Sequence, residues 1–164
     1  EEYETGHARK KVDELFLEDF CDYYIEIVKE RLYQPEKHGE AERRGAQHAL
    51  YHSLLGILKL YAVYIPHMTE YIYQSCFRGF EGAVSIHQLL WQQEKADELL
   101  LEFGGHLKET IGRVRKEKTE KQMSMKEAIP ELVITCPGKL RKLYKQSETD
   151  IRACNNAAAI IFRS

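Results

Sequence analysis

The chain has 164 residues, of which 43% are hydrophobic and 30% are charged, and its formal net charge is −2. This length suits one core, or one core with a small second unit, and the composition is that of a folded globular protein. No apolar run is long enough to span a membrane, and the charged first residues do not resemble a signal peptide. We therefore expect a soluble, cytoplasmic protein.

Charge is distributed unevenly along the chain. Residues 1–107 carry 11 Lys/Arg and 19 Asp/Glu, a net charge of −8, whereas residues 108–145 carry 11 and 5, a net charge of +6. Such asymmetry indicates either a segment that meets a polyanion or an ordinary solvated helix face, and charge alone does not decide between them.

The four cysteines provide no metal or redox motif. Cys21, Cys76, Cys136 and Cys154 are far apart, and no two of them form a Cys-x-x-Cys pair. We expect them to be reduced and mostly buried thiols.

Taken in chain order, apolar residues recur first at spacings of three and four, which predicts an amphipathic helix over residues 12–32 that ends before Pro35. A second helix is predicted over residues 41–65. It stops at Pro66, because proline lacks an amide donor and disfavours helical geometry in the preceding residue. Pro66 suits the first turn of a third helix over residues 67–77.

A connector follows the third helix. Gly79 and Gly82 break the helical pattern, and residues 83–91 are short and apolar. We predict an extended backbone over residues 84–87, and we expect Trp91 to pack at the edge of the core.

A fourth long helix is predicted over residues 93–120 from its apolar spacing. It contains Gly104 and Gly105, each of which costs about 1 kcal/mol in a helix relative to alanine. We interpret this pair as a sign of close helix packing or of a kink.

The pattern then changes from helix to sheet. A strand is predicted over residues 129–136, a short helix over 139–146 and a second strand over 157–162. The predicted fold class is mainly α: a helical bundle over residues 1–122 with a small α+β (β-α-β) satellite over residues 123–164.

Motifs for catalysis or metal binding are weak. His48 and His52 have the spacing of two ligands on one helix face, but no third ligand is near, so we interpret them as ordinary helix histidines. No Gly-x-Ser-x-Gly elbow and no Gly-rich phosphate loop occurs. The residues therefore indicate no catalytic site and no metal site in this chain.

Basic side chains cluster at the end of the fourth predicted helix and beyond it. RNA-binding modules combine such charge with aromatic or guanidinium planes that stack on unpaired bases. For each basic residue, a solvated surface role is the alternative. The candidate RNA-binding residues are Arg43, Arg44, Arg113, Arg115, Lys116 and Lys118.

Four passages resemble, in the same order, the anticodon-binding region of valyl-tRNA synthetases. Residues 16–29 resemble the helix in which a Phe-Cys-Asp-x-Tyr-x-Glu pattern precedes a lysine. Residues 49–73 resemble the leucine-rich helix, proline and Thr-Glu of the valyl, isoleucyl and leucyl group of class I synthetases. Phe20-Cys21-Asp22 favours the valyl over the isoleucyl enzymes, which tend to have a Leu-Ser pair there.

The other two passages follow the third predicted helix. Ser85-Ile-His87 followed by Trp91 is similar to the connector of this group, and residues 113–118 followed by 129–134 are similar to its helix-to-strand passage. The resemblance covers most of residues 6–136 and implies a mainly helical anticodon-binding fold.

The catalytic motifs of the family are not matched. Residues 121–126, Lys-Gln-Met-Ser-Met-Lys, resemble the Lys-Met-Ser-Lys-Ser loop but depart from it at the second lysine and follow the bundle, so we do not assign them that role. No His-Ile-Gly-His sequence occurs. The resemblance implies that catalysis, with ATP and Mg²⁺, belongs to other domains of a full-length ligase, and that this chain holds no cofactor.

The expected partners are valine tRNA and the remaining domains of the same synthetase, with no membrane and no DNA. The resemblance also implies that the bundle begins before residue 1. Apolar surface is then expected near the amino end, and the chain alone is expected to dimerise or to bind tRNA weakly. Two alternatives stay open: the same module of an isoleucyl enzyme, and a helical protein-interaction module without a role in RNA binding.

Overall fold

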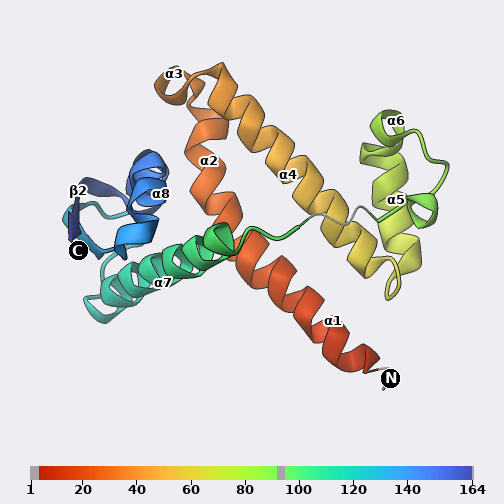
Figure 1. Cartoon of the computed structure of the whole chain (residues 1–164), viewed down its shortest axis with the longest axis horizontal. Coiled ribbons are helices and arrows are strands. Elements are labelled where there is room, and N and C mark those ends of the chain that lie inside the picture. The colour runs from red at the N-terminus through yellow and green to blue at the C-terminus, as the bar shows by residue number, and fades with distance from the viewer. Residues whose placement is uncertain (1–3, 92–94, 164) are drawn as a thin grey trace. The chain divides into compact units, whose positions relative to one another are not determined.

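The computed structural model describes residues 4–91 and 95–163, and most of them are helical (Figure 1). The chain divides into two compact units, Glu1–Ile25 with His38–Glu94 and Glu26–Lys37 with Lys95–Ser164. This division does not coincide with a boundary at residue 122. Among the described residues, no helix is both long and apolar enough to cross a membrane.

The first helical stretch begins earlier than the sequence predicts and is not a regular α-helix throughout. It starts as α1 (Thr5–Asp13), passes into the π-helix η1 (Glu14–Tyr24) and continues as α2 (Ile25–Tyr33). At the end of η1, the Ile25 amide bonds to the carbonyl of Phe20, five residues back. A π-helix of this length is rare, and the spacing of apolar residues does not distinguish it from an α-helix.

Helices α4 and α5 form the centre of the first unit. Helix α4 (Glu40–Tyr61) ends four residues before the predicted position, and α5 (Pro66–Cys76) begins with Pro66 in its first turn, as predicted. Helix α5 packs back on α4 (Figure 1). Their buried side chains make a core with Phe77 and Ile86: Leu55, Leu58, Ala62, Tyr73, Phe77 and Ile86.

The connector after α5 differs from the prediction. A single helical turn, α6 (Arg78–Glu81), ends at Gly82, whose φ of +73° is the left-handed conformation that glycine adopts without strain. The 3-10 helix η2 (Ile86–Gln88) takes the second half of the segment 84–87 that was predicted as extended, and Ser85, which precedes η2, has extended dihedral angles. The predicted packing of Trp91 is wrong, because 59% of this residue is exposed.

Apolar surface is present near the amino end, as expected: Leu15 and Leu17 in η1 are exposed. The four cysteines are free, as predicted, but the expectation that most are buried is wrong. Cys136 is buried, whereas Cys76 is exposed and the other two are intermediate.

The second unit contains the end of the first helical stretch, the first three residues of the single turn α3 (Pro35–His38) and the long helix α7 (Glu98–Glu120). Asp97 caps the start of α7, and its carboxylate accepts hydrogen bonds from the amides of Leu99 and Leu100 at 3.0 and 3.1 Å. Of the residues predicted at the helix start, 93 and 94 lie outside the described residues. A Cβ atom at Gly104 or Gly105 would meet nothing within 4 Å, so close packing does not explain these glycines.

The C-terminal segment is a β-α-β unit, as predicted. Strands β1 (Ile129–Thr135) and β2 (Ala157–Arg163) are parallel, and Ile129 pairs with Ala157. The crossover that parallel strands require contains η3 (Gly138–Leu140), α8 (Arg141–Gln146) and an unpredicted helix, α9 (Glu148–Asn155). Its core consists of Leu132, Ile134, Leu140, Tyr144 and Ile151.

Candidate nucleic-acid interface

The second unit has a positive net charge, and the first unit has a negative one. Residues 26–37 and 95–164 carry 17 Lys/Arg and 13 Asp/Glu, a net charge of +4. The first unit carries 7 and 13, a net charge of −6. A polyanion such as RNA is therefore attracted to the second unit and repelled by the first.

The predicted RNA contacts on α7 do not share one face. Arg113 Nη2 donates a hydrogen bond to the carbonyl of Val133 at 2.9 Å, which fixes this side chain against β1. Lys116 is exposed and its ammonium lies 3.9 Å from the Glu120 carboxylate, a distance and exposure at which an ion pair is weak. Lys116 is thus the member of this set that solvent, or a phosphate, reaches most easily.

Lys118 is an exception to the prediction. Only 3% of its surface is exposed, and its ammonium donates three hydrogen bonds to carbonyls, to Met125 at 3.0 Å, Glu127 at 2.6 Å and Asn155 at 3.1 Å. Burial lowers the pKa of Lys118, while the charge of Glu127 acts in the opposite direction. The ammonium joins α7 to the end of α9 and is not available to a phosphate, so Lys118 is corrected from an RNA contact to a structural residue.

A bidentate ion pair holds α2 to α9. Arg31 Nε donates to Asp150 Oδ1 at 2.7 Å, and Arg31 Nη2 donates to Asp150 Oδ2. Asp150 is buried, so its charge depends on this guanidinium for compensation. Together with Lys118, the pair places α2, α7 and α9 around one groove.

This groove, which we call the α2–α7–α9 groove, has a volume of about 890 Å³. Its wall includes the thiol of Cys154, whose pKa is raised by burial to about 12, so it is not a nucleophile at neutral pH. Its lining combines cationic, acidic and aromatic side chains: Glu26, Lys29, Glu30, Tyr33, Arg115, Lys118 and Lys126.

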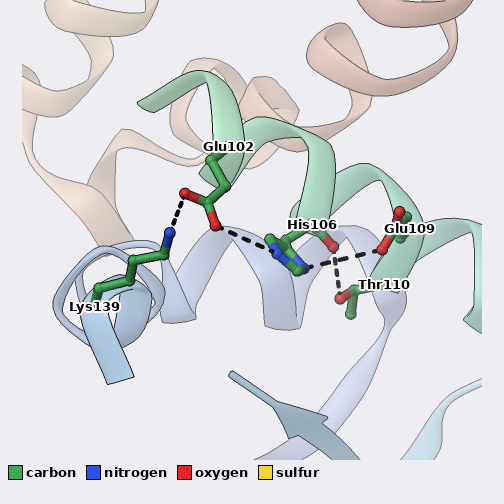
Figure 2. A network of polar contacts seen from close by, with 5 residues as sticks. All are labelled: Glu102, His106, Glu109, Thr110 and Lys139. Atoms are coloured by element: carbon green, nitrogen blue, oxygen red, sulfur yellow. Dashed lines mark hydrogen bonds and ion pairs between the residues drawn. The ribbon is translucent and has the colours of Figure 1, made fainter. Parts of the chain in front are cut away.

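The first half of α7 carries acids instead. Figure 2 shows Glu102, whose carboxylate lies 2.6 Å from the ammonium of Lys139 and 3.9 Å from the ring of His106. Glu109 lies 3.9 Å from the other ring nitrogen, and the two contacts to His106 are ion pairs when the imidazole is protonated. Lys139 is thus paired with an acid, which reduces its attraction for a phosphate.

Arg43 and Arg44 lie in the first turns of α4, in the first unit. Arg43 lies 3.4 Å from the Glu40 carboxylate, and its Nε atom is buried without a hydrogen-bond partner. Arg44 is exposed. Since the four α7 residues belong to the second unit, the structure assigns the predicted contacts to two separate units.

Polar contacts in the first unit serve its own folding. Tyr51 donates to Glu81 at 2.8 Å and Tyr61 donates to Asp13 at 2.6 Å. Burial, aided by these hydrogen bonds, raises the pKa of each phenol to about 12. Within residues 4–91 and 95–163, no group of three or more His, Cys, Asp or Glu side chains could hold a metal ion.

Two residues of the groove were absent from the predicted contacts. Tyr33 is the last residue of α2, and 76% of it is exposed. Lys126 is also exposed, in the segment before β1. Tyr33 falls outside the apolar spacing of residues 12–32, and a tyrosine off the buried face of a helix is the signal that identifies it.

Comparison with known proteins gives a consistent result. The family described as the anticodon-binding domain of tRNA ligase matches residues 1–134. Valine–tRNA ligase of Methanopyrus kandleri is 36% identical over 126 residues, 75% of this chain and 13% of that protein. The enzyme of the same name from Wolbachia pipientis wMel is 30% identical over 164 residues, 97% of this chain and 18% of that protein.

A third relative, valine–tRNA ligase of Orientia tsutsugamushi, is 35% identical over 132 residues, which cover 77% of this chain and 15% of the relative. The chain thus spans less than a fifth of the length of these relatives. The family match extends through α1 to α7 and most of β1. This chain belongs to the family of anticodon-binding domains of tRNA ligases.

Proposed function

We propose that this chain binds the anticodon arm of a valine tRNA, as part of a valine–tRNA ligase. The observation that carries the proposal is the family match over residues 1–134. The valine specificity is supported by the names of the relatives, which favour it over isoleucine. The positive net charge of the second unit provides the attraction for phosphates that any tRNA-binding module needs.

Under this proposal the chain contributes binding energy and orientation rather than chemistry. The aminoacylation reaction, with ATP and Mg²⁺, would take place in other domains of a cytoplasmic ligase. Exposed basic side chains of the second unit, which include Arg113 and Lys116, would neutralise phosphates, and Arg44 would add a contact from the first unit. Phosphate contacts position the RNA, whereas base contacts supply the preference for one anticodon.

The test is a competition experiment with this chain. Labelled valine tRNA transcript is bound at low salt, and unlabelled valine tRNA, isoleucine tRNA and valine tRNA with a changed anticodon are used as competitors. We expect valine tRNA to compete best and the binding constant to fall steeply with salt, because each phosphate contact contributes about −0.7 to −0.9 to the slope of log K against log salt.

Two results would contradict the proposal. Equal competition by all three RNAs would show that the chain does not distinguish between anticodons. No tRNA binding at low salt, with a protein ligand found instead, would favour a protein-interaction module.

A further inference from the structure

The α2–α7–α9 groove has the side chains that bind unpaired RNA. Tyr33 presents a largely exposed ring at the end of α2, and a flat aromatic face is a stacking surface for a base released from a helix. Arg115 on α7 and Lys126 before β1 line the same groove and carry positive charge. Stacking and charge are therefore combined within one cavity of the second unit.

The charged side chains that line the groove carry a net charge of +2, because Lys29, Arg115, Lys118 and Lys126 outnumber Glu26 and Glu30. Glu26 lies 3.0 Å from the ammonium of Lys29, and Glu30 lies 3.1 Å from that of Lys37. The C-terminal end of α9 brings the partial negative charge of its carbonyls to the same wall. The buried ammonium of Lys118 bonds to the Asn155 carbonyl there and offsets it.

We propose that this groove binds an unpaired segment of tRNA, with one base stacked on Tyr33 and with Arg115 and Lys126 at the neighbouring phosphates. The proposal rests on the proposed function, since it assumes that the chain binds tRNA, and it adds the place and the chemistry of one contact. The volume of about 890 Å³ lies in the range of cavities that hold ligands larger than a single ring.

The chain offers a matched control for the stacking residue. Tyr71 on α5 is 73% exposed, close to the 76% of Tyr33, but it belongs to the first unit and lies outside the groove. We expect Tyr33→Ala to weaken binding of an anticodon stem-loop RNA by about 5- to 150-fold, which is the cost of about 1–3 kcal/mol for one lost base stack. Tyr33→Phe keeps the ring and should bind within about twofold of the parent chain.

Two further measurements test the chemistry of the groove. The parent chain should bind the stem-loop more tightly than a duplex made from its stem, and Tyr33→Ala should remove most of this difference, because a paired base cannot stack on the ring. Lys126→Gln should reduce the salt slope by about 0.7, the value for one phosphate of a single strand. Lys10→Gln, an exposed lysine of the first unit, should leave the slope unchanged.

The outcomes separate the two proposals. If the parent chain binds no RNA at low salt, both proposals fail. If it binds tRNA but Tyr33→Ala and Tyr71→Ala bind alike, the anticodon-binding function stands and the groove is the wrong site. Circular dichroism of each variant excludes unfolding as the cause of a loss, and an exposed tyrosine is expected to contribute little to stability.

Discussion

The carboxylate of Glu70 accepts a hydrogen bond from the hydroxyl of Ser85 at 2.8 Å and another from the amide of Ile86 at 3.0 Å. Glu70 belongs to α5, and the other two residues lie where the connector turns into η2. Glu70 belongs to the Thr-Glu passage of the sequence and Ser85 to the Ser-x-His passage, 15 residues later. The two passages therefore contact each other in the folded chain. We infer that this contact holds the connector on α5.

We predict that Glu70 stabilises the first unit at neutral pH and that this stabilisation is lost in acid. The hydrogen bond from Gln74, followed by those from Ser85 and Ile86, lowers the pKa of Glu70 from its ordinary value of 4.5. A carboxyl group with a lowered folded-state pKa adds stability above its unfolded-state pKa, and this stability is lost as the pH falls through the folded value. Chemical unfolding measured between about pH 7 and pH 3 should show the loss.

The variant Glu70→Gln identifies the group. It should cost about 1 kcal/mol at neutral pH, the usual value of such a hydrogen bond, and the difference from the parent chain should shrink towards pH 3. Glu131→Gln, a change of an exposed glutamate on β1, is the control and should leave the pH profile as it was. The same profile for the parent chain and Glu70→Gln would show that Glu70 does not cause the acid loss.

The elements that could be predicted are those whose signal is local. Pro66 marks the start of α5, and the change of period after α7 marks the two strands, because a few neighbouring residues carry each signal. Helix α9 was missed since Ile151 is its one buried aliphatic residue and gives no period. The exposure of Trp91 was missed because the size of a side chain does not say what covers it: the Lys59 ammonium lies 4.5 Å from the centre of the ring, and 59% of the residue is exposed.

The site was harder to predict because its determinants are distant in sequence. In the sequence, Lys118 is one of several basic residues that follow closely on one another. The three carbonyls that accept hydrogen bonds from its ammonium belong to residues 125, 127 and 155, and the sequence does not show that they lie close to it. Tyr33 and Lys126 line one groove because three helices pack around it, and the spacing of residues in the sequence does not predict that packing.

The ion pair of Arg31 and Asp150 should be worth more to folding than exposed pairs of the same helix. Arg31→Met leaves the buried Asp150 carboxylate without its partner and should cost about 3 kcal/mol in the free energy of unfolding. Arg31→Met combined with Asp150→Leu removes both charges and should recover most of that loss. The control is Lys29→Met, which breaks the exposed pair with Glu26 and should cost less than about 1 kcal/mol. A double variant as unstable as Arg31→Met would contradict this reading.

Lys118 is predicted to stabilise the second unit. Lys118→Met keeps a long apolar stem but leaves the carbonyls of residues 125, 127 and 155 without their donor, which should cost about 2–4 kcal/mol. Lys121→Met changes an exposed lysine three residues later and should stay within about 0.5 kcal/mol of the parent chain. Denaturant unfolding of both variants gives the comparison, and equal midpoints would mean that the three hydrogen bonds contribute nothing net.

Lys116 should contribute to RNA binding through charge alone. Its side chain is 78% exposed and its ion pair with Glu120 is long, so its ammonium can meet a phosphate at little cost. If Lys116 contacts one phosphate of the bound tRNA, Lys116→Gln should reduce the magnitude of the slope of log K against log salt by about 0.7 to 0.9. It should also weaken the binding of valine tRNA and of isoleucine tRNA by the same factor. Lys10→Gln again serves as the control for a general charge effect. A loss confined to valine tRNA would instead place Lys116 at a base, since a phosphate contact carries no sequence information.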